Sequence, residues 1–186
     1  MALNDFLPYT AIGAGGGHVR IQWLQSGTAS PALPGEPVVV AADGQMDECA
    51  DDPASVAGIA IGVPVNGLSG ATLNYPFVNG LNPDRAIAAG DPLPVVVATS
   101  EQTFITARAL SDGSSFATTP ALANIGDAAS LNLISGNWGL RPGGGTNQIC
   151  RILDVLDAQG RSINQPGGSA GTGVYTVFKF VSGTQL

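Results

Sequence analysis

The side chains that could perform chemistry are few in this sequence. The single histidine, His18, directly follows the glycine-rich run 13–17. A Ser-His-Asp or Cys-His catalytic set needs a base held beside its nucleophile, and this position favours a structural or solvent-exposed histidine instead. The run 13–17 has no strand before it, no Gly-Lys-Ser/Thr sequence at its end and a strand rather than a helix after it, so it does not predict a phosphate-binding loop. We therefore predict no catalytic residue and no enzyme activity.

Acidic residues cluster in one segment, at Asp43, Asp47, Glu48, Asp51 and Asp52. Oxygen-rich loops can bind calcium, but this spacing does not match an EF-hand. Clustered carboxylates on a turn are more typical of a solvated loop that keeps a protein soluble. We predict no metal site, and whether the loop binds a cation stays open at this stage.

A second acidic pair, Asp154 and Asp157, has the residue types of a glycosidase acid/base couple. Proximity in sequence does not establish the required geometry, and a strand end or loop is the simpler interpretation. The two cysteines, Cys49 and Cys150, lie far apart and outside any Cys-x-x-Cys motif, so zinc is poorly supported. We expect two reduced, part-buried thiols and no cofactor.

The composition indicates an assembly rather than a lone monomer. Only 11% of residues are charged, and the chain holds 26 glycines and 13 prolines. A weakly charged, apolar chain would expose adhesive surface unless copies or a partner covered it, so we expect a homo-oligomer. The formal charge of −7 argues against direct nucleic-acid binding. The most apolar stretch, 56–65, is broken by glycines and a proline and is too short for a membrane span.

The hydrophobic pattern of the chain predicts short β-strands. Val19, Ile21 and Trp23 alternate with polar neighbours, and the same two-residue period occurs in 102–109 and 174–181. The last of these strands is expected to be central or inter-subunit.

Two further segments, 35–40 and 90–97, each place a Gly-acid-Pro turn before a run rich in valine. They should enter strands in the same way, and an internal duplication of a hairpin is conceivable. The candidate helices are 120–129 and 150–156, but the first contains Gly126 and the second also fits a strand, so at most one short helix is expected.

Together these patterns predict an all-β fold, either a compact β-sandwich or a β-barrel of β-tulip-like form. Residues 1–17 show little alternation and are expected to form an extended N-terminal arm. Residues 18–186 are expected to form the β-rich domain. Because the N-terminus lacks a basic region and an apolar core, we expect no secretion signal and synthesis in the cytoplasm.

The segment Leu33–Pro64, LPGEPVVVAADGQMDECADDPASVAGIAIGVP, resembles a pattern in the capsid decoration (cement) proteins of tailed bacteriophages. There a G-x-P-V-V strand precedes a small polar excursion and an apolar strand, here AGIAIG at 57–62. The AAGDPL sequence at 88–93 is similar to a second strand entry of that family.

The resemblance implies a structural protein of the virion that adds to the outside of a completed head. It implies homotrimers that bind the major capsid protein and tie neighbouring capsomers together. An N-terminal arm often reaches the capsid lattice in this family. Here the arm's apolar residues are the candidate capsid contacts: Leu3, Phe6, Leu7, Tyr9 and Ile12.

Two other classes remain open from the sequence. A phage tail or receptor-binding β-protein would show fibre-like repeats or an aromatic binding groove. A β-barrel enzyme domain with an unrecognised site would show a pocket with converging titratable groups.

Overall fold

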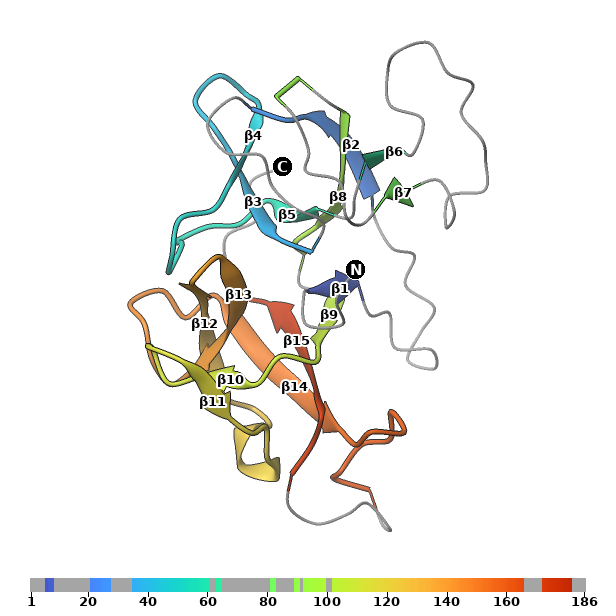
Figure 1. The fold of residues 1–186 in the computed structure, drawn as a ribbon, viewed down its shortest axis with the longest axis vertical. Coiled ribbons are helices and arrows are strands. Elements are labelled where there is room, and N and C mark those ends of the chain that lie inside the picture. The colour runs from blue at the N-terminus through green and yellow to red at the C-terminus, as the bar shows by residue number, and fades with distance from the viewer. Residues whose placement is uncertain are drawn as a thin grey trace.

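A computed structural model describes residues 6–8, 21–27, 35–60, 63–64, 81–82, 89–90, 92–99, 102–165 and 172–181. The fold is all-β, as predicted, and its strands form two parts that lie one above the other in Figure 1. The strands of the first part are β2 (Ile21–Gln25), β3 (Pro37–Val40), β4 (Met46–Glu48), β5 (Gly58–Ala60) and β8 (Pro92–Val97). The second part holds β1 (Leu7–Pro8), β9 (Thr103–Thr106), β12 (Ala128–Ile134), β13 (Asn137–Pro142), β14 (Cys150–Leu156) and β15 (Tyr175–Phe180).

The first part is a small barrel. Its five strands run in the order β2-β8-β5-β3-β4, with every neighbouring pair antiparallel. A parallel bridge between Ser26 and Met46 joins the two edge strands, and the N–H of Gly27 donates to the carbonyl of Met46 over 2.7 Å. The interior is filled by small and medium apolar side chains: Val38, Met46, Ala57, Ala60, Leu93 and Val95. Closure leaves few exposed strand edges in this part of the molecule.

The repeated Gly-acid-Pro segments enter equivalent strands of this barrel. Gly35 and Gly90 both have positive φ angles, 96° and 81°, which glycine adopts without the steric cost of a Cβ. The strands that follow, β3 and β8, lie on the two sides of β5 and both pair with it antiparallel. The prediction that both segments enter strands in the same way is therefore confirmed.

Strand β8 holds two prolines, although it lies between two neighbours in the sheet. Strand β5 pairs only with residues 95–97, so Pro92 and Pro94 lie beyond the end of β5. The missing proline N–H groups therefore cost no hydrogen bond to β5, which is how a non-edge strand tolerates them.

The second part is a six-stranded sheet with the order β1-β9-β15-β14-β12-β13. Strand β15 lies between β9 and β14, so the prediction of a central final strand is confirmed. Strands β12 and β13 form a hairpin whose two loop residues, Ser135 and Gly136, have φ angles of 51° and 75°. Two consecutive positive φ angles are the geometry of a type I′ turn, whose twist suits a two-residue hairpin.

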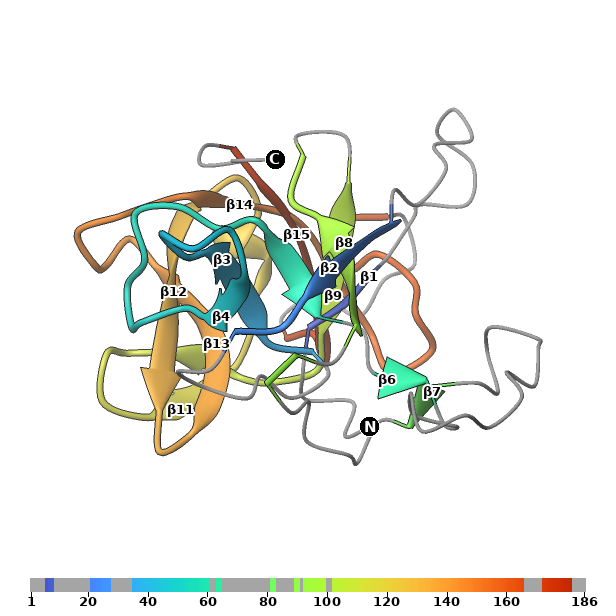
Figure 2. The ribbon, with the colours of Figure 1, turned by 90° about the horizontal axis from the view of Figure 1, so that it is seen from above.

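Two short ladders complete the fold: β10 (Leu110–Ser111) pairs with β11 (Phe116–Thr118), and β6 (Val63–Pro64) pairs with β7 (Leu81–Asn82). Figure 2 shows the β6–β7 ladder to one side of the barrel. In the described part of the chain the only helical element is a 3-10 turn at Leu122–Asn124, inside the predicted 120–129 segment. The alternative helix at 150–156 is strand β14.

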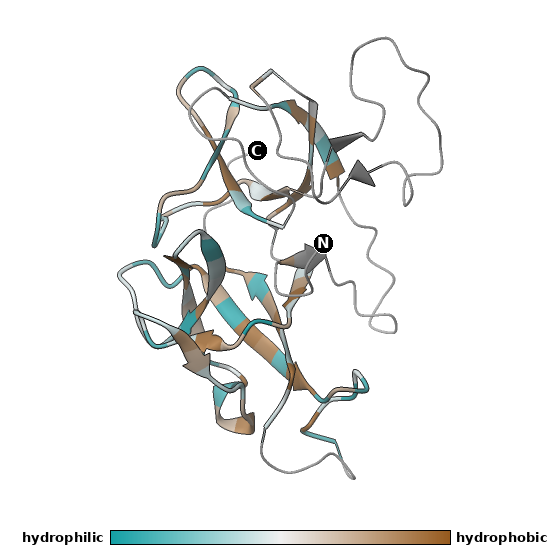
Figure 3. Cartoon of the chain, in the orientation of Figure 1, coloured by the Kyte–Doolittle hydropathy of each residue, from teal (hydrophilic) through white to brown (hydrophobic). Residues whose placement is uncertain are grey.

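One hydrophobic core connects the two parts. It combines aromatic residues of the six-stranded sheet, including Phe104, Phe178 and Phe180, with Ile59 and Val96 from the outer wall of the barrel. The three phenylalanine rings are mutually packed with centroids 5.3–5.7 Å apart. Figure 3 shows apolar residues on strands of both parts, where they approach each other. We call the contact region between barrel and six-stranded sheet the junction.

Candidate functional site

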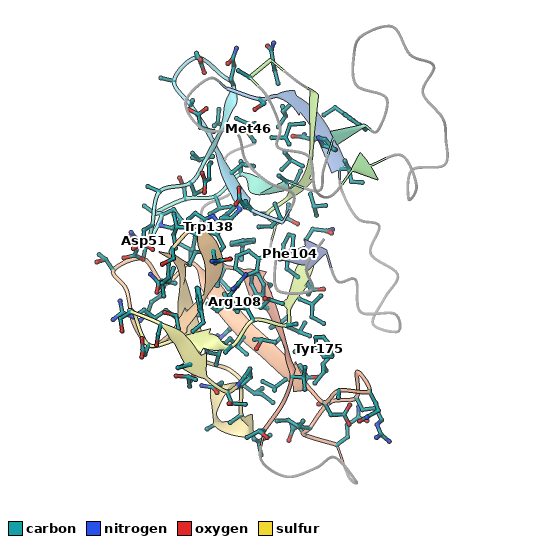
Figure 4. The ribbon with its side chains drawn as sticks, viewed as in Figure 1. Met46, Asp51, Phe104, Arg108, Trp138 and Tyr175 are labelled. Carbon is teal, nitrogen blue, oxygen red and sulfur yellow. The ribbon has the colours of Figure 1, made fainter. Side chains whose placement is uncertain are left out.

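The acidic segment lies at the junction. Strand β4 ends at Glu48, and the chain then passes from the barrel to the edge of the six-stranded sheet formed by β12 and β13. Figure 4 shows Asp51 and Trp138 close to this boundary, with Met46 farther up in the barrel. The carboxylates of Glu48, Asp51 and Asp52 all accept hydrogen bonds from the other part of the fold, so the segment is more than a solvated loop. Asp51 itself is exposed, as that interpretation expects.

Asp51 binds the end of strand β12. One of its carboxylate oxygens, Oδ1, accepts from Nδ2 of Asn132 at 2.9 Å and from the backbone N–H of Leu133 at 2.7 Å. Asn132 in turn accepts from the hydroxyl of Ser111 in β10. The carboxylate thus fixes a hairpin end that lies 81 residues away in the sequence.

Asp52 binds the loop after β13. Its Oδ2 accepts from the N–H of Thr146 at 2.6 Å, and its Oδ1 accepts from the N–H of Asn147 at 3.1 Å. Nδ2 of Asn147 donates back to the Asp52 carbonyl at 2.7 Å. Asp52 has a φ of 51°, a left-handed conformation that aspartate tolerates better than most residues. The sequence indicated the carboxylates but not these partners, since Thr146 and Asn147 carry no recognisable motif.

The cysteines are buried and unbridged, as expected from the sequence. Burial, reinforced by the neighbouring charge of Glu48, raises the pKa of the Cys49 thiol to about 12. Burial alone raises the pKa of Cys150 well above its ordinary value. Reactive cysteines need accessible thiolate, so both side chains have the environment of core residues.

Asp154 and Asp157 shape the turn after β14 and do not face a common site. Asp154 accepts from the Ser162 hydroxyl at 2.7 Å and from the N–H of Val155 at 2.8 Å. Asp157 accepts from the N–H groups of Gln159 and Arg161 and forms a 3.3 Å ion pair with the Arg161 side chain. These backbone donors and the arginine charge lower the pKa of Asp157. The simpler interpretation of this pair, a loop at a strand end, fits its contacts.

The candidate capsid contacts are only partly within the described residues. Phe6 is fully buried in the shared core, so its proposed contact with a capsid is wrong for this conformation: the ring packs against Phe178 instead. Leu7 lies in strand β1, paired with Ile105 of β9. Leu3, Tyr9, Ile12 and the predicted boundary at residue 17 lie outside the described residues, as do His18 and the run 13–17.

Strand β2 of the barrel carries an exposed apolar pair. The expected alternation exists in β2, but its apolar members face outward: Ile21 is 40% and Trp23 is 47% exposed. Leu24 is the residue of this strand that packs against the barrel interior. Strands β2 and β8, with sequences IQWLQ and PLPVVV, contain no charged residue. The side chains of β8 from Leu93 to Val97 are buried, so the exposed surface belongs to β2. We call this outward face of β2, with Ile21 and Trp23, the wall, and it is the best candidate for an interaction surface.

Comparison of the chain with protein-family models, with curated proteins and with solved structures identifies no match in any of the three. Within the described ranges, no group of three or more histidine, cysteine, aspartate or glutamate side chains is arranged to hold a metal ion. The described residues also contain no helix long and apolar enough to cross a membrane.

Proposed function

We propose that this chain is a structural, non-catalytic protein that binds the outside of a tailed-bacteriophage head and stabilises contacts between capsomers. The observation that carries the proposal is the structural use of its acidic side chains. Glu48, Asp51 and Asp52 join the two β-parts, while Asp154 and Asp157 hold a turn. Carboxylates that are used in structural hydrogen bonds make the fold rigid. A rigid fold suits a protein that must keep its shape while it holds capsomers together.

The wall, the outward face of β2, supports the proposed homotrimer. Ile21 and Trp23 present large apolar side chains on strands without charge, and such surfaces are typical of protein interfaces. A trimer offers each head contact in several copies, so weak single contacts combine through effective concentration into long residence on the shell. The proposed partner is the major capsid protein at the virion exterior.

The test of head binding is an add-back experiment. Heads of the phage that encodes this chain, assembled without it, are incubated with the purified protein and sedimented. We expect saturable binding at a fixed ratio to the major capsid protein and greater resistance of the heads to heating. Recovery no higher than that of an unrelated acidic β-protein would refute the decoration function.

The test of the interface uses a matched pair of surface substitutions. Trp23→Lys adds a charge to the wall, while Leu122→Lys changes a side chain of similar exposure, 47% against 48%, in the 3-10 turn of the second part. We expect light scattering to show a lower mass for Trp23→Lys and an unchanged mass for Leu122→Lys. Equal masses for both variants and the wild type would remove the wall from the proposed interface.

A further inference from the structure

Phe6 lies in a buried position between the two parts of the fold, beside Phe178 and the backbone of Gly35. We call this position the socket. The Phe6 side chain is 0% exposed, and its ring meets Phe178 edge-on with centroids 5.1 Å apart. Its backbone N–H donates to the carbonyl of Gly35, at the start of the barrel, over 3.3 Å. Residues 7–8 then pair with β9 as the edge strand β1. One short segment, 6–8, therefore contacts both the barrel and the six-stranded sheet.

The chain that joins this segment to β2 is long. Twelve residues, 9–20, separate Pro8 from Ile21, and four of the five residues in 13–17 are glycine. An extended chain spans about 3.3–3.6 Å per residue, so this connection can reach about 40 Å. A compact chain of 186 residues, the length of the whole protein, has a radius of gyration of about 16 Å. The segment 6–8 can thus reach the socket of its own chain or that of a neighbouring copy.

We propose that the segment 6–8 is exchanged between copies of the chain in the assembled protein. Phe6 of each copy then fills the socket of a neighbour, and β1 adds to the neighbour's β9. The contacts in the socket are the same for a segment from either chain, so exchange gives up none of them. It also joins chains whose low charge and exposed Ile21 and Trp23 already favour an interface.

Each copy gives one segment and receives another, either reciprocally between two copies or head-to-tail among three or more. A head-to-tail arrangement leaves no socket empty only when it closes into a ring. A trimer is such a ring, with three donors and three acceptors. The inference rests on the homo-oligomer of the proposed function and does not depend on head binding.

Cysteine bridging tests the exchange directly. Leu7 and Ile105 are opposite each other in the β1–β9 ladder, so Leu7→Cys combined with Ile105→Cys places two thiols across it. The full-length purified variant is treated with a short thiol-bridging reagent and analysed on a denaturing gel. We expect covalent dimers and trimers. The native thiols of Cys49 and Cys150 are buried, and the wild-type chain controls for them.

A matched control shows how two cysteines on neighbouring strands of the same chain behave. Arg151 and Lys179 are opposite each other in the β14–β15 ladder, so the double variant Arg151→Cys, Lys179→Cys should form a bridge within the chain and run as a monomer. Mixing Leu7→Cys chains with Ile105→Cys chains before assembly should give bridged dimers only if segments exchange. Each single variant alone should stay unbridged.

Two results would overturn the exchange. A bridge within one chain for Leu7→Cys, Ile105→Cys means that Phe6 fills its own socket, and no bridge means that 6–8 does not pair with β9. If circular dichroism shows the double variant unfolded, a photo-crosslinking residue at position 7 gives the same readout from one substitution. A trimeric mass with bridges confined to single chains refutes exchange alone, whereas a monomeric mass refutes the oligomer itself.

Discussion

Trp138 and Glu48 lie on opposite sides of the junction, and Nε1 of the Trp138 indole donates a hydrogen bond to Oε1 of Glu48 over 3.2 Å. Trp138 is 2% exposed and belongs to strand β13, whereas Glu48 ends strand β4 of the barrel. A buried indole N–H that loses its acceptor costs free energy, since water does not reach it freely. The pair therefore couples the position of the barrel to that of the sheet.

Removing the acceptor of this pair should destabilise the protein. We expect Glu48→Ala to lower the free energy of unfolding by about 1–2 kcal/mol, because the Trp138 N–H then lacks a partner. Glu48→Gln keeps an oxygen acceptor and should lose less than half of that. Urea unfolding followed by Trp fluorescence measures both. Equal stability of Glu48→Ala and the wild type would contradict the coupling.

Substitutions at Asp52 should separate its backbone role from its carboxylate role. Asn tolerates the φ of 51° and keeps one acceptor, so Asp52→Asn should be mild. Asp52→Ala loses both acceptors and strains the backbone, and should cost about 2 kcal/mol more than Asn. Thermal unfolding of the two variants gives the comparison. An alanine variant as stable as the asparagine variant would show that neither effect operates.

Phe6 should behave as a core residue and not as part of a free arm. Phe6→Ala is expected to cost about 3–5 kcal/mol, and Phe6→Leu clearly less, because the first leaves a cavity beside Phe178. Denaturant unfolding of both variants supplies the values. A loss below about 0.5 kcal/mol for Phe6→Ala would place the ring outside the core.

The thiols should be unreactive in the native protein. The pKa of Cys49 is raised to about 12 and that of Cys150 is raised well above its ordinary value, so neither forms thiolate at pH 8. We expect no native reaction with a thiol reagent and two reactive groups per chain in non-reducing denaturant. Finding none in denaturant would mean that the cysteines are bridged.

Asp112 should make stability depend on pH in the acid range. Hydrogen bonds from the backbone N–H groups and hydroxyls of Ser114 and Ser115 hold its pKa far below the ordinary value of 3.8. A lowered native pKa stabilises the folded state above the unfolded pKa, and this contribution is lost as pH falls further. The stability difference between wild type and Asp112→Asn should therefore shrink between about pH 5 and pH 2. A difference that stays constant over this range would exclude the effect.

The sequence predicted several strands correctly because their signals are local, whereas strands β10 to β13 were not predicted. The Gly-acid-Pro entries at 35–40 and 90–97 and the alternation in 174–181 depend on neighbouring residues, and the structure has strands in all three places. The type I′ turn at Ser135 and Gly136 is also local, but its Ser-Gly sequence is less distinctive than Asn-Gly and does not by itself predict the hairpin.

The partners of the carboxylates could not be predicted in the same way. Asp52 meets Thr146 and Asn147 across more than 90 residues, and no local pattern records which loops a barrel and a sheet bring together. The two-residue period predicts strand β2 correctly, but the period alone does not say which face of the strand is buried. Leu24, between Trp23 and Gln25, packs against the barrel interior, while Trp23 faces outward.

The sheet order also affects synthesis on the ribosome. All five barrel strands lie between residues 21 and 97, so the barrel can close while the rest of the chain is still being made. Phe6, in contrast, is 172 residues from Phe178. At a translation rate of about 5–20 residues per second, roughly 10–30 s pass between the emergence of the two rings. The segment 6–8 thus leaves the ribosome early but is among the last to find its place in the core.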